Sequence, residues 1–343
     1  MAIVGDSGTT GAASSPNLEP MFGNIWDHFW SAVRNPRVQT ELPLLAEFPA
    51  SERWHFDSVQ PLTRVPYSRQ EYEDEGNFVS RFFLNQSVKV FSKLDVPEHA
   101  FGYMVGRGLG IKPSDIVLVG QDGVMVETIP AQFGRIYEMK TKTLPPLVLV
   151  SYTANDLCDE RVIDEPLEKW AGRFKANLGE AWIAAEPYLK AHPRGTHIVV
   201  LAPLDVVNVI TNPEVLSQTT NVEGEGQMTC AEVRRGLTSW APTAWIVSRM
   251  LTRMCPSVTE THVNDTERLT RLKDLQLAFN EAWKSEIQEL NAQYASKNIR
   301  WSYLESARDL HFAKGDVGND CFHPSVRGHA KLADLILQSG ELQ

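Results

Sequence analysis

Short apolar runs alternate with longer segments of helical character along much of this chain. The most strand-like run lies at residues 145–151, where two prolines are followed by an uninterrupted Leu-Val-Leu-Val. Such continuity indicates burial on both faces, as in the strands of a parallel sheet. Strands that alternate with long helices predict an α/β fold with a parallel sheet sandwiched between helices. The other strand candidates are residues 2–4, 115–119, 198–201 and Ile299–Leu304.

The clearest helical pattern lies in residues 266–296, where apolar side chains recur every three or four positions. We interpret this stripe as a seam facing the core rather than a site for a partner. Its members are Leu272, Leu275, Phe279, Trp283, Ile287, Leu290 and Tyr294. Further helices are expected over residues 123–137, 165–190 and Val326–Gln338, the last with Ser325 as its N-cap.

We expect a single domain spanning residues 1–343. The length allows one large domain or two modest ones, and 43% hydrophobic with 22% charged residues is ordinary for a soluble globular protein. Residues 22–99, rich in aromatic residues and prolines, are expected to form an insertion or cap between the first two strands. The glycines of residues 106–110 lack the spacing of a phosphate-binding loop and predict a flexible turn.

The charge balance and the start of the chain limit the classes of protein considered. A net charge of −10 repels a phosphate backbone, and no basic patch opposes it, so no nucleic-acid partner is expected. No run approaches the ~18 apolar residues needed to span a bilayer. Residues 2–4 resemble the end of a strand, and strands usually have ~5–6 residues. We therefore expect a secreted, extracytoplasmic or lumenal protein whose leader has been removed from this chain.

Two short motifs at opposite ends of the chain carry nucleophile chemistry. Gly5-Asp6-Ser7 follows the first strand, which places the Ser7 hydroxyl at the carboxyl end of the sheet. Asp320 and His323 are separated by two residues on an irregular turn before the last helix. There the carboxylate orients one imidazole nitrogen while the other faces the serine. Each motif is common turn chemistry alone, but together they predict a nucleophile, its general base and an orienting carboxylate.

Two further motifs supply donors for a developing oxyanion. Asn155 follows the strongest strand, and its carboxamide is expected at the same edge of the sheet as Ser7. Gly123 follows the second strand, where a glycine lets its backbone amide approach the oxyanion. With the Ser7 amide they form the expected oxyanion hole. Asp6 and Asp156 are interpreted as hydrogen-bond acceptors that organise the loops.

These motifs, in this order, resemble the four blocks of the SGNH/GDSL hydrolase family of serine esterases and lipases. The blocks are carried by Gly5-Asp6-Ser7, Gly123, Asn155-Asp156 and Asp320-x-x-His323. Residues 155–158 and 320–325 are most similar to the phospholipase B-related branch. The resemblance implies a three-layer α/β/α fold with a five-stranded parallel sheet of flavodoxin-like type. It also implies the absence of a metal or other cofactor, and an acyl-enzyme resolved by water.

Four cysteines, Cys158, Cys230, Cys255 and Cys321, permit two disulfides in any of three pairings. Four unpaired core thiols are the alternative. If Cys158 and Cys321 are oxidised, each disulfide stiffens a loop that carries a candidate site residue.

We expect serine-dependent hydrolysis of carboxylic esters, with lipid or phospholipid esters as substrates and a transient contact with a membrane surface. A carbohydrate O-acetylesterase is an alternative within enzymes. A catalytically silent module that binds a glycan or lipid through Trp26, Trp30 and Trp54 is an alternative from another class. An α/β-hydrolase is not expected, because Thr9 stands where the last glycine of Gly-x-Ser-x-Gly would be.

Overall fold

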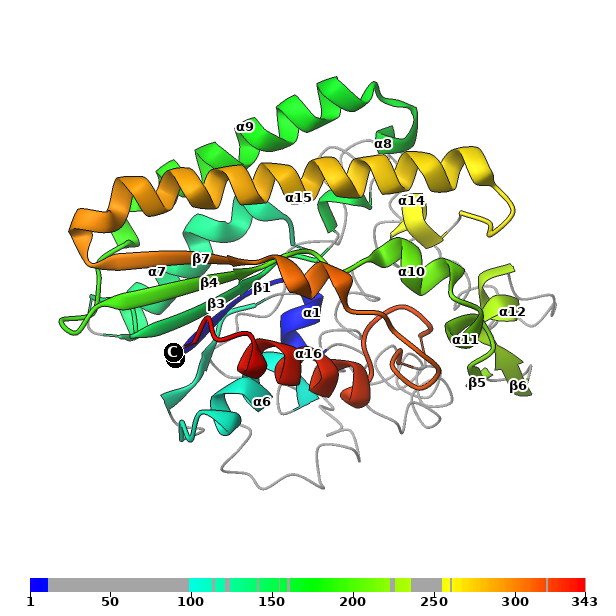
Figure 1. Ribbon diagram of the computed structural model, residues 1–343, viewed down its shortest axis with the longest axis horizontal. Helices are drawn as coiled ribbons and strands as arrows, with labels where there is room; N and C mark the ends of the chain where they lie inside the picture. Colours follow the sequence, from blue (N-terminus) through cyan, green and yellow to red (C-terminus); the bar gives the residue numbers. More distant parts are fainter. Residues whose placement is uncertain are drawn as a thin grey trace, which may run out of the picture.

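Five parallel strands form the centre of the structure, a computed structural model, and helices cover both faces of the sheet (Figure 1). The sheet comprises β1 (Ala2–Gly5), β2 (Val117–Leu118), β3 (Leu147–Ser151), β4 (Thr196–Leu201) and β7 (Ile299–Leu304), in the order β2-β1-β3-β4-β7. This is the doubly wound order of flavodoxin-like folds, in which the winding reverses between β1 and β3. Ligands of open α/β sheets bind beyond the carboxyl ends of the strands at that point.

The structure describes residues 1–11, 99–112, 115–120, 124–140, 142–153, 155–158, 161–222, 226–235, 255–259, 261–318 and 320–342. The expected insertion at residues 22–99 lies outside these ranges apart from His99, as do Trp26, Trp30 and Trp54.

Each face of the sheet packs against its own layer of helices. Helices α7 (Ile129–Met139), α9 (Leu167–Ala185) and α15 (Thr266–Tyr294) cover one face, together with buried aromatic side chains such as Trp182 and Trp283. Helices α6 (Phe101–Gly108) and α16 (Val326–Gln338) cover the other. Alternate residues of β1 divide between the two cores, because successive side chains of a strand point to opposite faces.

Shorter elements lie mostly beyond the carboxyl ends of the strands, on the right of Figure 1. They include the hairpin of β5 (Thr219–Val222) and β6 (Gly226–Thr229), which was not predicted from the sequence. The short α-helices are α1 (Ser7–Thr10), α8 (Arg161–Asp164), α10 (Val206–Thr211), α11 (Pro213–Leu216), α12 (Cys230–Arg235) and α14 (Pro256–Thr259). Single 3-10 turns occur at Val126–Thr128, Asn155–Leu157, Glu186–Tyr188, Ala295–Lys297 and Glu305–Asp309. None of the described helices is long and apolar enough to cross a lipid bilayer.

The five predicted strands and the long helices are confirmed, although several of their bounds differ from those predicted; β4 begins at Thr196, and α9 ends at Ala185. The strand expected at residues 115–119 pairs with β1 only over Val117–Leu118. Beyond Leu118, the side chain of Gln132 from α7 forms hydrogen bonds to β1 where a backbone strand would otherwise pair. The Gly5 amide donates to Gln132 Oε1 at 2.8 Å, and Gln132 Nε2 donates to the Gly5 carbonyl at 3.0 Å. The helix expected from residue 123 begins at Ile129, where Pro130 suits the first turn of a helix.

The prediction of a flexible turn at residues 106–110 is wrong for its first part, which belongs to α6. Cβ atoms added at Gly102, Gly106 and Gly108 would lie 2.6, 2.5 and 2.6 Å from Ile3, Ile116 and Leu337 side chains, respectively. These glycines therefore serve close packing of α6 against the sheet and α16 rather than flexibility.

The stripe of α15 faces the core, and all seven of its predicted members are buried. The N-cap prediction at Ser325 is also confirmed, since its hydroxyl accepts from the Gly328 amide at 3.2 Å.

All four cysteines form disulfides, which decides among the three pairings. Cys158 is joined to Cys255 and Cys230 to Cys321. Two disulfides are typical of a protein that matures in an extracytoplasmic, oxidising environment.

We expect Gly5→Ala to lower the free energy of unfolding by ~3 kcal/mol or more. Gly5 has φ +148°, and an added Cβ would lie 1.9 Å from the Ser151 carbonyl oxygen in the neighbouring strand. Urea denaturation measures the change. Gly172→Ala is the matched control, because its position in α9 is open and helical; it should raise stability by up to ~1 kcal/mol. Equal stability of Gly5→Ala and the wild type would contradict the steric argument.

Candidate active site

The structure brings Ser7, His323 and Asp320 into one chain of hydrogen bonds. His323 Nε2 lies 3.0 Å from Ser7 Oγ, and His323 Nδ1 lies 2.5 Å from Asp320 Oδ2. Asp320 is 4% exposed and Ser7 8%, so both lie largely out of water. With Nδ1–H donating to the carboxylate, Nε2 is left as an acceptor for the serine proton. This arrangement can make a hydroxyl nucleophilic.

Ser7 opens α1, the short helix at the carboxyl end of β1, and Asp6 is its N-cap. One oxygen of the Asp6 carboxylate accepts from the Gly8 amide at 3.0 Å. The other accepts from the amide and hydroxyl of Thr153, at 2.6 and 2.7 Å. Asp6 therefore ties the turn of Ser7 to the loop that follows β3, in agreement with its predicted role as an organising acceptor.

The turn that carries Asp320 and His323 is shaped by the same carboxylate that orients the imidazole. Asp320 Oδ1 accepts from the backbone amides of Phe322 and His323, both at 3.0 Å. Cys321 adopts φ 61°, a left-handed conformation. The Gly318 amide donates to the His323 carbonyl at 2.7 Å and closes the loop.

A buried carboxylate anchors this loop to α16. Asp316 is fully buried, and its side chain pairs with Arg327 and Lys331 of that helix. Its carbonyl accepts from the Ser325 amide at 2.9 Å. Asp316 was not among the residues predicted from the sequence. The pattern that indicates it is an aspartate a few residues before a helix, with two basic residues within that helix.

Asn155 begins the 3-10 turn that follows β3. Strand β3 pairs with β1, the strand that precedes Ser7. Its Nδ2 donates to the Val124 carbonyl at 3.0 Å. Because a carboxamide nitrogen has two hydrogens, this bond orients the group and leaves a second N–H. The disulfide at Cys158, three residues on, holds the same loop.

Gly123 lies outside the described residues, so its predicted place in the oxyanion hole stays a prediction. Gly120, in the same segment, packs against the helix of Ser7. A Cβ at Gly120 would lie 1.9 Å from Thr9 Oγ1 and 3.3 Å from the Gly5 carbonyl oxygen. The segment just after β2 therefore lies against the turn that carries Ser7.

The pKa values of two carboxyl groups near Ser7, those of Asp6 and Asp156, are shifted. Burial raises the pKa of Asp6, while its hydrogen bonds from Thr153 and Gly8 and the nearby His323 oppose that shift. Burial also raises the pKa of Asp156 well above its usual value, and the charges of Glu127 and Asp6 add to the effect. Asp156 Oδ1 accepts a long bond, 3.5 Å from the Val126 amide, and Oδ2 has no hydrogen-bond partner.

A second buried histidine lies on α16 beyond His323. Burial, together with the charges of His323 and His99, lowers the pKa of His329 to about 3. The Phe101 amide donates to His329 Nδ1 at 3.4 Å. His329 is therefore neutral at neutral pH and does not compete with His323 for a proton.

No protein-family model matches this chain, and no curated protein matches it significantly. Within the described part of the chain, no three His, Cys, Asp or Glu side chains gather in a way that could hold a metal ion.

We expect Asp6→Asn to lower the free energy of unfolding by ~1–3 kcal/mol, because an amide nitrogen would face N–H donors that now bind a carboxylate oxygen. Chemical denaturation measures the loss. Thr153→Ser is the control, since it keeps the hydroxyl and the amide that bind Asp6 and should change stability little. An Asp6→Asn variant as stable as the wild type would show that these bonds contribute nothing.

We expect Asp156→Asn to stabilise the protein increasingly as the pH rises above about 4. A raised pKa means that the folded protein keeps this proton where the unfolded chain has lost it. The stability that the group contributes is therefore full at low pH and declines as the pH rises through this window. Asparagine removes the decline. Unfolding curves from about pH 3 to 8 should coincide at the acid end and separate above it; loss of stability in the variant at neutral pH would contradict this.

Proposed function

We propose that this protein is a serine hydrolase that cleaves carboxylic esters through an acyl-enzyme, of the SGNH/GDSL type that its motifs resemble. The hydrogen bond from Ser7 to His323, continued to Asp320, carries the proposal. The location supports it, because the site lies at the carboxyl ends of β1 and β3, where the winding of the sheet reverses. Disulfides and the composition are compatible with secretion, which we include in the proposal.

In the first step, Ser7 Oγ attacks the ester carbonyl while His323 Nε2 takes its proton. Asp320 stabilises the resulting imidazolium through the Nδ1–H bond without itself becoming protonated. The tetrahedral intermediate then expels the alcohol, which receives its proton from His323, and the acyl group remains on Ser7. In the second step, water attacks the acyl-enzyme with His323 again as base, releasing the acid and restoring Ser7.

The negative charge on the carbonyl oxygen needs fixed donors near Ser7. The second Nδ2–H of Asn155 is our assignment, because the first is held by Val124 and so fixes the direction of the amide. The Ser7 amide, at the start of α1, is the second donor. The Gly123 amide, from the loop after β2, completes the proposed set.

We expect Ser7→Ala to reduce hydrolysis of p-nitrophenyl acetate to background. Asn155→Ala should lower kcat by ~100–1000-fold with little change in KM, because its donor acts in the transition state. Steady-state kinetics checks both. Ser285→Ala is the matched control, since that hydroxyl lies on α15 and bonds Glu289; its activity should equal that of the wild type.

The same measurement separates this function from a catalytically silent binding module. A binding module would show the same background turnover in the wild type and in Ser7→Ala, on both short and long p-nitrophenyl esters. For an enzyme, product analysis on phospholipids, acylglycerols and acetylated glycans identifies the substrate. Faster release from the long-chain esters supports the lipid substrates that we propose, and selective deacetylation of glycans contradicts them.

A further inference from the structure

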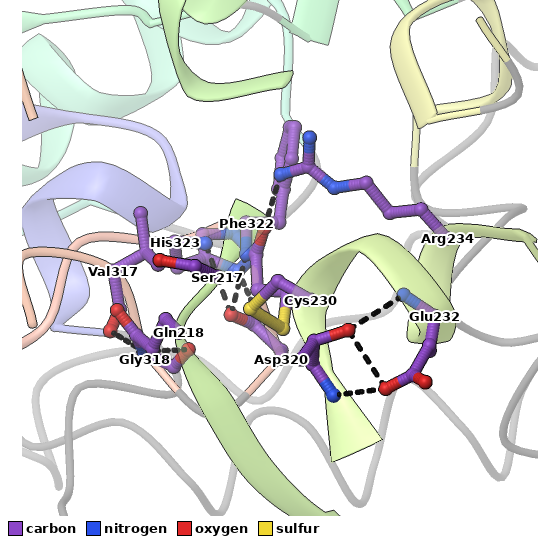
Figure 2. The surroundings of a disulfide bond; sticks show 12 residues. Ser217, Gln218, Cys230, Glu232, Arg234, Val317, Gly318, Asp320, Phe322 and His323 are labelled. Atoms are coloured by element: carbon purple, nitrogen blue, oxygen red, sulfur yellow. Dashed lines mark hydrogen bonds and ion pairs between the residues drawn. A yellow bond between two sulfur atoms is a disulfide. The ribbon is translucent and has the colours of Figure 1, made fainter. Parts of the chain in front are cut away.

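The short helix α12 contacts the turn that carries Asp320 and His323. Cys230, its first residue, forms the disulfide with Cys321. Arg234, one turn later, donates from Nη2 to the carbonyl oxygen of Cys321 at 2.5 Å. Figure 2 shows Arg234 reaching the Phe322–His323 segment from one direction while the disulfide of Cys230 approaches from another. Helix α12 is therefore bonded to both the side chain and the backbone of Cys321.

Cys321 is the residue of the turn that most needs such support. Its φ of 61° is uncommon for a residue other than glycine and costs of order 1 kcal/mol or more. This conformation turns the amides of Phe322 and His323 toward Asp320 Oδ1. If Cys321 relaxed, those amides would move away, and Asp320 and His323 would lose their alignment.

Arg234 brings a partly buried positive charge to this turn. Its Nη1 is shielded from water and has no hydrogen-bond partner. Burial lowers the pKa of Arg234 to about 10, and the nearby Asp320 carboxylate opposes that shift. At neutral pH the guanidinium is therefore charged, and its attractions to Asp320 and to the Cys321 carbonyl oppose the cost of desolvating it.

Gln218, just before the β5–β6 hairpin, bonds the part of the loop that precedes Asp320. The Cys230 amide donates to the Gln218 carbonyl at 2.7 Å, which links α12 to Gln218 across the hairpin. The Gln218 side chain accepts from the Gly315 amide at 2.9 Å and donates to the Val317 carbonyl at 2.8 Å. Residues 218–235 therefore hold this loop at two places, at Gly315 and Val317 before the turn and at Cys321 within it.

We propose that Arg234 is a positioning residue for the candidate triad, acting with the Cys230–Cys321 disulfide to hold the turn in which Asp320 aligns His323. Arg234 does not touch the substrate in this proposal. It acts through the backbone of Cys321 and through its attraction to the Asp320 carboxylate. The inference rests on the proposed function, because alignment of His323 matters for turnover only if Ser7 is the nucleophile.

The test compares Arg234→Met and Arg234→Lys with the wild type. We expect Arg234→Met to lower kcat for p-nitrophenyl acetate by ~10–100-fold, the size of effect that a misplaced catalytic group produces, with KM within about threefold. Arg234→Lys keeps the charge but loses the planar fork, so it should recover part of the lost kcat. Arg194→Met is the matched control, because this exposed arginine precedes β4 at the opposite end of the strands; its kinetics should be unchanged.

A proton NMR spectrum gives a readout that does not depend on turnover. The Nδ1–H of His323, bonded to Asp320, should resonate far downfield in the wild type and in Arg234→Lys. In Arg234→Met this resonance should be lost or broadened. Assignment comes from its absence in His323→Gln.

The outcomes separate the two proposals. A folded Arg234→Met variant with wild-type kcat and an intact downfield resonance overturns the role of Arg234 and leaves the esterase proposal standing. If both Arg234 variants lose the native fold in thermal melts, the residue is structural and the positioning role is wrong. If the wild type has no Ser7-dependent turnover, the esterase proposal fails, and the resonance alone still decides whether Arg234 aligns Asp320 and His323.

Discussion

The hydrogen bond between His323 and Ser7 joins residues that are 316 positions apart, and the candidate site depends on it. Neither residue reaches the other unless the first strand and the last loop arrive at the same edge of one sheet. The parallel sheet provides that edge, because β1 ends beside β3 where the direction of winding reverses. Two groups that are ordinary turn residues in isolation are thereby placed as a candidate nucleophile and a candidate base.

Buried polar groups, rather than additional strand pairing, hold the loops around this bond. Asp6 connects the turn of Ser7 to the loop of Asn155, and Asp316 attaches the His323 loop to α16. Each disulfide holds a loop that carries a candidate site residue. Burying charged groups costs free energy of desolvation, and hydrogen bonds and ion pairs must offset this cost. Here those bonds fix the geometry of the loops. Asp156, with a raised pKa and an oxygen without a hydrogen-bond partner, is a place where the cost is not offset.

Sequence patterns predicted the regular elements well where one period dominated. The buried strands and the stripe of α15 were recognisable because continuous apolar runs and three-to-four spacing have few alternatives. The β5–β6 hairpin was not predicted, since its short polar strands carry little apolar alternation. The glycines of α6 were wrongly predicted to form a flexible turn. Glycine is common in flexible turns, but here it allows a helix to pack closely against its neighbours.

The residues that could do chemistry, and the order in which strands and helices follow one another, were evident from the sequence alone. Composition and periodicity are local properties, so they are visible without coordinates. The folded chain was needed to show that Ser7 and His323 meet, which cysteines pair, and that Gln132, Thr153 and Arg234 support the site. Those contacts join segments far apart in the chain, and their formation depends on how the layers pack, which no local pattern encodes.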